Sequence, residues 1–207
     1  MIRASGLAKR FGDKRVLQGV DFELPRGGFF VVTGPNGSGK TTLLRLCAGL
    51  AAPTTGELEV TVDRAGIGFL GHEPLVYKEL TALENLDLYG RLYAIEERRE
   101  RIGMLLERFG LWDVRGELVS TFSRGMAQRL ALCRSLLHDP ELLILDEPSN
   151  GLDPSGMAAF RQMIRSFVEL DGPDLVIAPV AAQHVGLALH ELCANALQHG
   201  SLSAPEG

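Results

Sequence analysis

A single run of residues, Gly34-Pro35-Asn36-Gly37-Ser38-Gly39-Lys40-Thr41-Thr42, constrains the fold of this chain more than any other feature. The run satisfies the pattern G-x-x-x-x-G-K-[ST] and lies between a predicted buried strand, residues 29–33, and a segment of helix-forming composition, residues 41–50. Glycines let the backbone wrap around a phosphate, so that successive amides and the helix N-terminus face anionic oxygens. An ordinary glycine-rich turn would have to contain Lys-Thr in register by accident. The run therefore predicts a phosphate-binding loop in an α/β fold.

The same pattern also predicts which side chains contact the phosphates and the metal ion. The Lys40 ammonium would reach the β- and γ-phosphates, and the Thr41 hydroxyl would ligate Mg2+. Further along the chain, the apolar strand predicted at residues 142–145 ends in Asp146 and Glu147. Adjacent strand residues point in opposite directions, so the two acids cannot do the same job. We expect Asp146 to hold Mg2+, directly or through a water, and Glu147 to polarise the water that attacks the γ-phosphate. The alternative is a solvated strand end.

Apolar periodicity outlines the order of the elements. Strands are predicted at residues 16–24, 58–62 and 66–70, and helices at 96–109, after Ser123, and at 154–170. Thr81 and Glu84 match a capping box ahead of apolar residues at helical intervals, namely Leu83, Leu86, Leu88, Tyr89 and Leu92. The pattern predicts one domain, residues 1–207, in which an all-helical insertion, 76–121, separates two parts of an α/β core, 1–75 and 122–207.

Composition excludes several classes of protein. Of the 207 residues, 45% are hydrophobic, which suffices for a substantial core. The 21 basic and 26 acidic residues give a net charge of -5, so we expect no nucleic acid partner. The most apolar stretches, 142–145 and 175–182, are far shorter than the roughly 20 residues of a spanning helix. Residues 1–10 lack the apolar stretch of a secretory signal, and Cys47, Cys133 and Cys193 lack metal-ligand spacing. We therefore expect a cytoplasmic location, with the thiols in packing roles.

Two further motifs narrow the family. Ser123-Arg124-Gly125-Met126-Ala127-Gln128-Arg129 resembles the signature motif of ABC ATPases, and Glu147-Pro148-Ser149-Asn150-Gly151-Leu152-Asp153 resembles their Walker B exit and D-loop. The resemblance covers essentially the whole chain. It implies the ABC type of P-loop NTPase core, with an inserted all-helical subdomain and an N-terminal antiparallel β subdomain. Arg124 and Met126 replace the glycine and glutamine usual in the signature, whereas Ser123 and Gly125 are kept.

The resemblance also implies how such a site is assembled. Ser123 is expected to cap the helix that follows it, and in this family that positive helix end faces the γ-phosphate held by the opposite subunit. Hydrolysis would then require a homodimer or paired cassette, with Gly125 and Asp153 contributing to nucleotide binding. Phe11 stands where family members stack an aromatic ring on adenine, although an isolated aromatic is more often a core residue. The implied ligands are ATP and Mg2+, and the implied partners are integral membrane permease subunits, which would place the chain at the cytoplasmic face of the cell membrane.

Two departures from the family pattern are informative. His72, in Gly71-His72-Glu73-Pro74, occupies the position of the usual Q-loop glutamine, where a neutral imidazole can still form a hydrogen bond near Mg2+. This stretch and the following residues, 80–86, resemble most the ATPase of the haem exporter used in cytochrome c maturation. Such segments also occur in exporter ATPases for drugs or lipids.

The second departure lies near the end of the chain. His184 aligns with the switch histidine that contacts the γ-phosphate in the family, and His190 and His199 are nearby alternatives. The surroundings of His184 differ from the pattern, because Pro179 interrupts an expected central strand and Gln183 replaces the usual threonine. A failed assignment of His184 would leave ATP binding intact and make hydrolysis doubtful.

The sequence leaves two functional classes open. In the first, the chain is a transport ATPase, in which closure of two copies on ATP moves a permease and hydrolysis reopens them. In the second, it is an ATP-gated regulatory module with weak hydrolysis. A chromosome-maintenance or translation-factor ATPase of the same superfamily lacks support, because the sequence has neither long coiled-coil heptads nor a second cassette.

Overall fold

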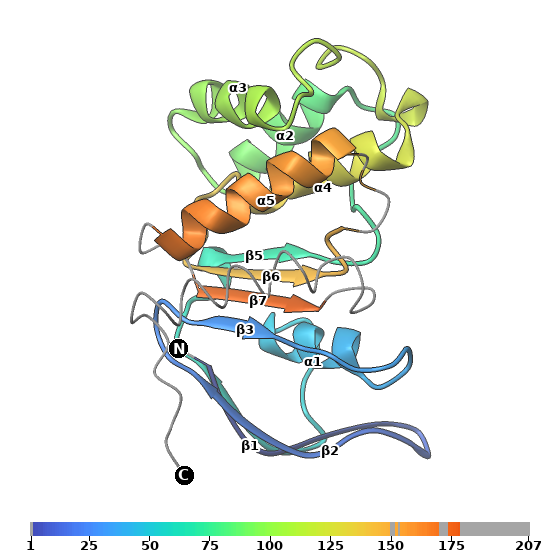
Figure 1. Ribbon diagram of the computed structural model, residues 1–207, viewed down its shortest axis with the longest axis vertical. Coiled ribbons are helices and arrows are strands. Elements are labelled where there is room, and N and C mark those ends of the chain that lie inside the picture. Colours follow the sequence, from blue (N-terminus) through green and yellow to red (C-terminus); the bar gives the residue numbers. More distant parts are fainter. Residues whose placement is uncertain (1, 150–151, 153, 170–173, 179–207) are drawn as a thin grey trace.

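The computed structural model describes residues 2–149, 152, 154–169 and 174–178, which form successive layers (Figure 1). One outer layer is an antiparallel sheet of β1 (Ile2–Phe11), β2 (Lys14–Leu24) and β4 (Thr55–Val60), in the order β2-β1-β4. The strands predicted at 16–24 and 58–62 are thus confirmed, with ends displaced by a few residues. The N-terminal antiparallel sheet that the family resemblance implied is also confirmed.

A parallel sheet forms the centre of the molecule. Its order among the described residues is β3-β7-β6-β5, made of β3 (Phe29–Val31), β7 (Asp174–Ala178), β6 (Leu142–Asp146) and β5 (Ile67–Leu70). Every residue of β6 is buried. Both faces of a parallel sheet are covered by other layers, so its central strands consist of continuous apolar residues. This is why the strand could be predicted from the sequence.

Helices fill both faces of the parallel sheet (Figure 1). The helix α1 (Lys40–Cys47) contacts both the antiparallel and the parallel sheet, so it lies between them. On the other face lie α4 (Arg124–Leu136) and α5 (Pro154–Glu169), and beyond them α2 (Ala82–Leu92) and α3 (Arg98–Arg108). Two 3-10 turns, Arg64–Gly66 and Val119–Thr121, complete the described elements. The structure is the expected α/β fold, and the boundaries drawn at residues 75 and 121 stay a prediction.

The packing of the core agrees with the layers. One cluster joins α1 to both sheets, through Leu44 and Leu46 of the helix, Leu7 of β1 and Ile144 of β6. Cys47 also lies in this cluster, and burial raises the pKa of its thiol to about 12. Burial likewise raises the pKa of the Cys133 thiol in α4. Both thiols are free and buried, which confirms their packing role, whereas Cys193 lies outside the described residues.

The capping box predicted at Thr81 is present. The Thr81 hydroxyl accepts a hydrogen bond from the Glu84 amide at 3.1 Å, and the Glu84 carboxylate accepts one from the Thr81 amide at 2.8 Å. The hydrogen bonds that the Glu84 carboxylate accepts from the Thr81 amide and from the Thr81 hydroxyl hold the pKa of Glu84 below its ordinary value. The helix starts where it does because two otherwise open amides are satisfied there.

Asn85 is a buried polar residue on α2 that the periodicity did not reveal. It is fully buried, while Leu83 and Leu92 are 42% and 71% exposed. The Asn85 side chain accepts a hydrogen bond from the Tyr77 amide at 2.7 Å and donates to the carbonyls of Tyr77 and Thr81, both at 2.9 Å. One side chain therefore fixes the loop that leads into the helix.

We expect Asn85→Ala to lower the free energy of unfolding by about 3 kcal/mol, because it removes the hydrogen bonds of a fully buried side chain to the Tyr77 amide and to the Tyr77 and Thr81 carbonyls. Urea denaturation followed by circular dichroism measures this change. The matched control is Arg91→Ala on the same helix, which breaks only an i,i+4 pair with Asp87 and should cost about 0.5 kcal/mol. Equal losses in the two variants would contradict the role assigned to Asn85.

Candidate functional site

The glycine-rich run forms an exposed loop between β3 and α1. Gly37 and Gly39 adopt left-handed φ values of 82° and 99°. A Cβ atom at Gly39 would also lie 2.9 Å from Cδ2 of Leu17. Both conformation and space therefore require glycine at this position. Gly39 is also the N-cap of α1 and offers no side-chain hydrogen bond, so the first amides of the helix are left for a ligand.

Lys40, the first residue of α1, turns its side chain back onto this loop. Its Nζ donates hydrogen bonds to the carbonyl oxygens of Gly34 at 2.9 Å and Pro35 at 3.1 Å, and the residue is only 8% exposed. The ammonium thus already lies inside the loop that would surround a phosphate. A bound anion would compete with the two carbonyls for the same three donor positions.

A pocket of about 430 Å³ opens beside the loop. Its walls come from β1 and β2, from the glycine-rich run and from the residue after β6, and consist of Phe11, Lys14, Val16, Asn36, Gly37, Gly39, Lys40, Thr41, Thr42 and Glu147. Phe11 is 56% exposed rather than a core residue, and Nζ of Lys9 lies 5.1 Å from its ring centroid. An exposed aromatic face at the rim of a phosphate pocket has the chemistry to stack on a nucleobase.

The acidic pair at the end of β6 divides as expected. Glu147 lines the pocket, whereas Asp146 is only 1% exposed. Glu147 also adopts a left-handed φ of 52°, a conformation that costs a non-glycine residue energy and occurs preferentially at functional sites. One carboxylate is therefore buried at the end of the strand, whereas the other reaches the pocket from the first residue after it.

Asp146 has the environment of a metal ligand. Neither of its carboxylate oxygens has a hydrogen-bond partner among the described residues. Burial raises the pKa of Asp146 above its ordinary value, and the neighbouring Thr41 side chain partly opposes this effect. Among the described residues, no group of three or more His, Cys, Asp or Glu side chains could hold a metal alone. A site with Asp146 and Thr41 as its protein oxygens suits Mg2+, which takes its other ligands from waters and substrate phosphates.

We expect Asp146→Asn to raise the melting temperature of the nucleotide-free protein while abolishing its response to Mg2+. Removing a charge that burial destabilises should gain about 1 kcal/mol, or about 2–4 °C. Differential scanning fluorimetry with and without Mg-ATP measures both effects. Asp63→Asn removes an exposed carboxylate and serves as the control, which should leave both quantities unchanged. A lower melting temperature for Asp146→Asn would contradict the inference that the buried Asp146 charge destabilises the nucleotide-free protein.

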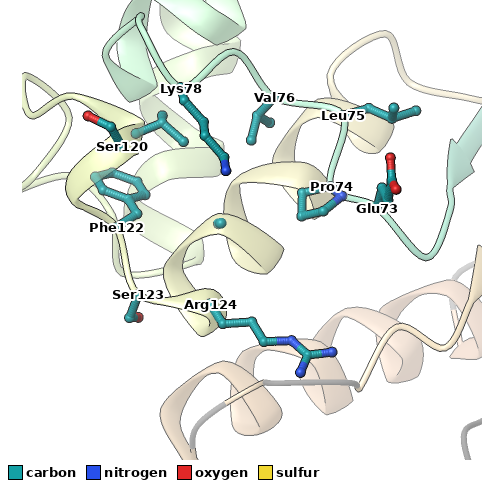
Figure 2. Close-up of a pocket in the computed structure, with 11 residues that line it drawn as sticks. Glu73, Pro74, Leu75, Val76, Lys78, Ser120, Phe122, Ser123 and Arg124 are labelled. Atoms are coloured by element: carbon teal, nitrogen blue, oxygen red, sulfur yellow. The ribbon is translucent and has the colours of Figure 1, made fainter.

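A second groove, of about 640 Å³, lies between the loop after β5 and the start of α4 (Figure 2). Its walls are mainly apolar, with Pro74, Leu75 and Val76 on one side and Phe122 on another, and Lys78 extends into it (Figure 2). Arg124 extends along its edge. The groove shares no lining residue with the pocket beside the glycine-rich loop.

The signature segment begins at this groove. Ser123 is the N-cap of α4, and its hydroxyl accepts a hydrogen bond from the Met126 amide at 3.2 Å, which confirms the predicted cap. Gly125 is buried in the first turn. Ser123 lines the groove and not the phosphate pocket, so the structure does not bring the signature and the phosphate loop together in one pocket of one chain.

His72 is placed beside Glu147 rather than in the pocket. It does not line the pocket, and its Nδ1 lies 3.4 Å from Oε2 of Glu147. Two other predicted site residues, Asp153 and His184, lie outside the described residues, as do His190 and His199. The central strand β7 pairs with β3 up to Ile177 and with β6 up to Ala178. The next residue, Pro179, lies outside the described residues.

Some residues that line the phosphate pocket and the groove were not predicted from the sequence. Lys14 and Val16 line the phosphate pocket, and Lys78 and Phe122 line the groove. The hairpin position of Lys14, close to Phe11, is a signal that could have identified it. Nothing in the local pattern identifies Lys78 or Phe122, because two distant segments create the groove.

The comparison with known families agrees with this geometry. The family model described as ABC transporter matches residues 17–150, which include the phosphate loop, the signature segment and the acidic pair. The chain belongs to the ABC transporter family. Members of this family are ATP-binding cassettes that act as ATPases.

Curated ABC relatives carry more specific names. The daunorubicin resistance ATP-binding protein DrrA3 of Streptomyces coeruleorubidus is 43% identical over 178 residues, which cover 81% of this chain and 56% of that protein. The bacitracin transport ATP-binding protein BcrA of Bacillus licheniformis is 37% identical over 178 residues, covering 82% and 58%. The uncharacterized ABC transporter ATP-binding protein YdbJ of Bacillus subtilis is 34% identical, covering 99% and 68%. The chain spans little more than half the length of the first two.

Solved ABC cassettes share the fold. A dimeric structure of a post-hydrolysis state of the ATP-binding cassette MJ0796, bound to ADP and Pi, superposes with a TM-score of 0.80 at 27% identity and covers 91% of this chain and 90% of that one. Another dimeric structure of MJ0796 gives a TM-score of 0.79 at 26% identity, with the same coverage of both chains. These neighbours establish the cassette fold that the sequence motifs implied. Among the described residues, no helix is long and apolar enough to cross a lipid bilayer.

Proposed function

We propose that the chain is the ATP-binding and ATP-hydrolysing subunit of an exporter whose membrane-spanning part is a separate permease. The observation that supports this most is the pocket in which the phosphate loop, the Lys40 ammonium and the Glu147 carboxylate converge. In this proposal Phe11 stacks on adenine, the loop from Gly34 to Thr42 holds the phosphates, and Asp146 and Thr41 hold Mg2+.

The proposed reaction is the hydrolysis of ATP to ADP and inorganic phosphate. A water oxygen bonds to the γ-phosphorus, and the bond from that phosphorus to the β–γ bridging oxygen breaks, leaving its electrons on ADP. Glu147 orients the water, and Lys40 stabilises the charge that develops on the phosphate oxygens. Bound Mg2+ would supply further neutralisation of that charge. His184 is proposed as an additional contact to the γ-phosphate.

Completion of the site by a second copy follows from where the signature lies. Ser123 and Gly125 belong to a region separate from the phosphate pocket, so a head-to-tail partner is needed to present them, with Asp153, to the nucleotide. The Met126 amide donates a hydrogen bond to the Ser123 hydroxyl, which caps α4. In the dimer, the positive N-terminus of α4 would face the γ-phosphate held by the opposite subunit. The dimeric cassettes of the same fold support this arrangement.

The groove between the loop after β5 and α4 is proposed as the docking site of the permease. It is mainly apolar, it lies next to His72 and the signature, and its charged lining residues are Lys78, Arg124 and Glu73. A cytoplasmic segment of the permease that docks here would be displaced when either the loop after β5 or the start of α4 moves. Docking would hold this chain at the cytoplasmic face of the cell membrane.

The cargo is proposed to be an antibiotic or a related amphipathic drug or peptide. Relatives that match most of this chain are named for daunorubicin resistance and for bacitracin and lantibiotic transport. Haem export is the second candidate, supported by the resemblance of residues 71–86 to the haem exporter ATPase. A deletion strain separates them, because loss of drug tolerance with intact cytochrome c supports the first and the reverse supports the second.

The deciding experiment measures turnover of Mg-ATP by the purified chain, first alone and then with membranes that contain a permease encoded by a neighbouring gene. Hydrolysis per chain that increases with protein concentration is expected, because a dimer forms the site. No turnover in either preparation, with Mg-ATP still bound, would favour an ATP-gated regulatory module. No binding of Mg-ATP to folded protein would refute the proposal.

A further inference from the structure

The register of the parallel sheet places two side chains next to each other at its carboxyl edge. In the pairing of β5 with β6, Leu70 lies opposite Leu145. His72 and Glu147 each lie two residues beyond this pair, just after the ends of the two strands, and Nδ1 of His72 lies 3.4 Å from Oε2 of Glu147. The contact therefore depends on the sheet as well as on the loop that carries His72.

We propose that His72 is a positioning residue for ATP hydrolysis, which acts by holding one oxygen of the Glu147 carboxylate. This inference rests on the proposed function of Glu147. An imidazole with its proton on Nδ1 can donate to Oε2, which leaves Oε1 to accept from the attacking water. The imidazole thus limits rotation of the carboxylate without touching the nucleotide.

Two observations favour positioning over the alternatives. The His72 side chain is 59% exposed and that of Glu147 is 20% exposed, and a polar contact with one partner this exposed contributes little to stability. His72 is also absent from the lining of the phosphate pocket, whereas Glu147 is part of it. A direct role in nucleotide binding therefore has less support than a role through Glu147.

The backbone at Glu147 explains why such support is useful. Its left-handed φ of 52° is an uncommon state for a residue with a side chain, and it persists only when surrounding structure holds it. An imidazole at the neighbouring strand end is one part of that surrounding structure. The two side chains come from different strands, so neither segment alone specifies the carboxylate's orientation.

The first test measures steady-state hydrolysis by the full chain over a range of Mg-ATP concentrations that extends to saturation. We expect His72→Ala to lower kcat about 10-fold and to leave KM within about twofold, because orientation of a proton-accepting group affects the chemical step. His72→Gln supplies an amide donor and should recover most of the rate. The matched control is Arg3→Ala, which breaks an exposed ion pair with Glu23 at 3.1 Å, far from the pocket, and should keep wild-type kinetics.

The second test detects the contact between His72 and Glu147 by NMR, without measuring ATP hydrolysis. In protein labelled with 15N-histidine, the signals of His72 are those that disappear in His72→Gln. For the neutral form of this imidazole we expect the wild type to carry the proton on Nδ1, and Glu147→Ala to shift it toward Nε2.

The outcomes separate this inference from the proposed function. If the wild type hydrolyses ATP but His72→Ala behaves as Arg3→Ala does, the positioning role is refuted and the ATPase stands. A higher kcat, or a KM raised more than kcat is lowered, also refutes it, because His72 would then restrain Glu147 or bind nucleotide. An unchanged His72 spectrum in Glu147→Ala refutes the contact itself. Absence of any wild-type turnover refutes the ATPase and with it the role of His72.

Discussion

Replacing Glu147 with Gln is expected to lower kcat for ATP hydrolysis by about 100- to 1000-fold while leaving Mg-ATP affinity within about threefold. Glu147 lines the phosphate pocket, and its carboxylate is the described acid best placed to orient a water there. The amide keeps the shape of the side chain but cannot accept a proton. ATP should therefore bind, close two copies and remain uncleaved.

Such a variant should accumulate as a dimer when ATP and Mg2+ are present. Sedimentation velocity measures that shift, and phosphate release measures the rate. The control is Glu141→Gln, at the opposite end of β6, where Glu141 pairs with Arg26 at 3.5 Å on the surface. A Glu147→Gln protein that hydrolyses ATP at the rate of Glu141→Gln would refute the assignment of the catalytic carboxylate.

Replacing Lys40 with Ala is expected to weaken Mg-ATP binding by about 30-fold or more. The Lys40 ammonium lies within the phosphate loop, and removing one member of a buried charge pair typically costs 2–5 kcal/mol. Isothermal titration calorimetry measures the affinity directly. The loss should appear in binding as well as in hydrolysis, unlike the loss in Glu147→Gln.

The loop also loses two hydrogen bonds in this variant, so folding must be checked. Circular dichroism and the melting temperature should remain close to those of Arg99→Ala, which removes an exposed positive charge on α3 and should bind Mg-ATP normally. Folded Lys40→Ala protein that binds Mg-ATP as Arg99→Ala does would refute the phosphate site.

The parts of the fold predicted correctly are those with a strong local signal. The strand that ends at Asp146 is buried on every residue, and the capping box at Thr81 satisfies specific amides, so both could be located from sequence. The phosphate loop was equally legible, because left-handed backbone at Gly37 and Gly39 restricts the residues that can stand there. Element ends moved by a few residues because they depend on tertiary pairing.

Features that join distant segments were not predictable in this way. The Asn85 side chain satisfies a loop that precedes its own helix, and the groove beside Ser123 forms only when residues 73–78 meet residues 119–127. The proximity of His72 to Glu147 depends on the order of strands in the sheet, which no local pattern encodes. Periodicity reports which face of a helix is apolar, but not which polar side chain completes a distant hydrogen-bond network.

The position of α1 between the two sheets has a consequence for motion. Side chains of this helix pack against both sheets, so the helix cannot come loose without opening the cluster that joins them. Its amides should accordingly exchange with solvent deuterium nearly as slowly as global unfolding permits. The glycine-rich turn is then anchored at its C-terminal end to a part of the protein that rarely opens, and its preorganised shape reduces the ordering that a ligand must impose.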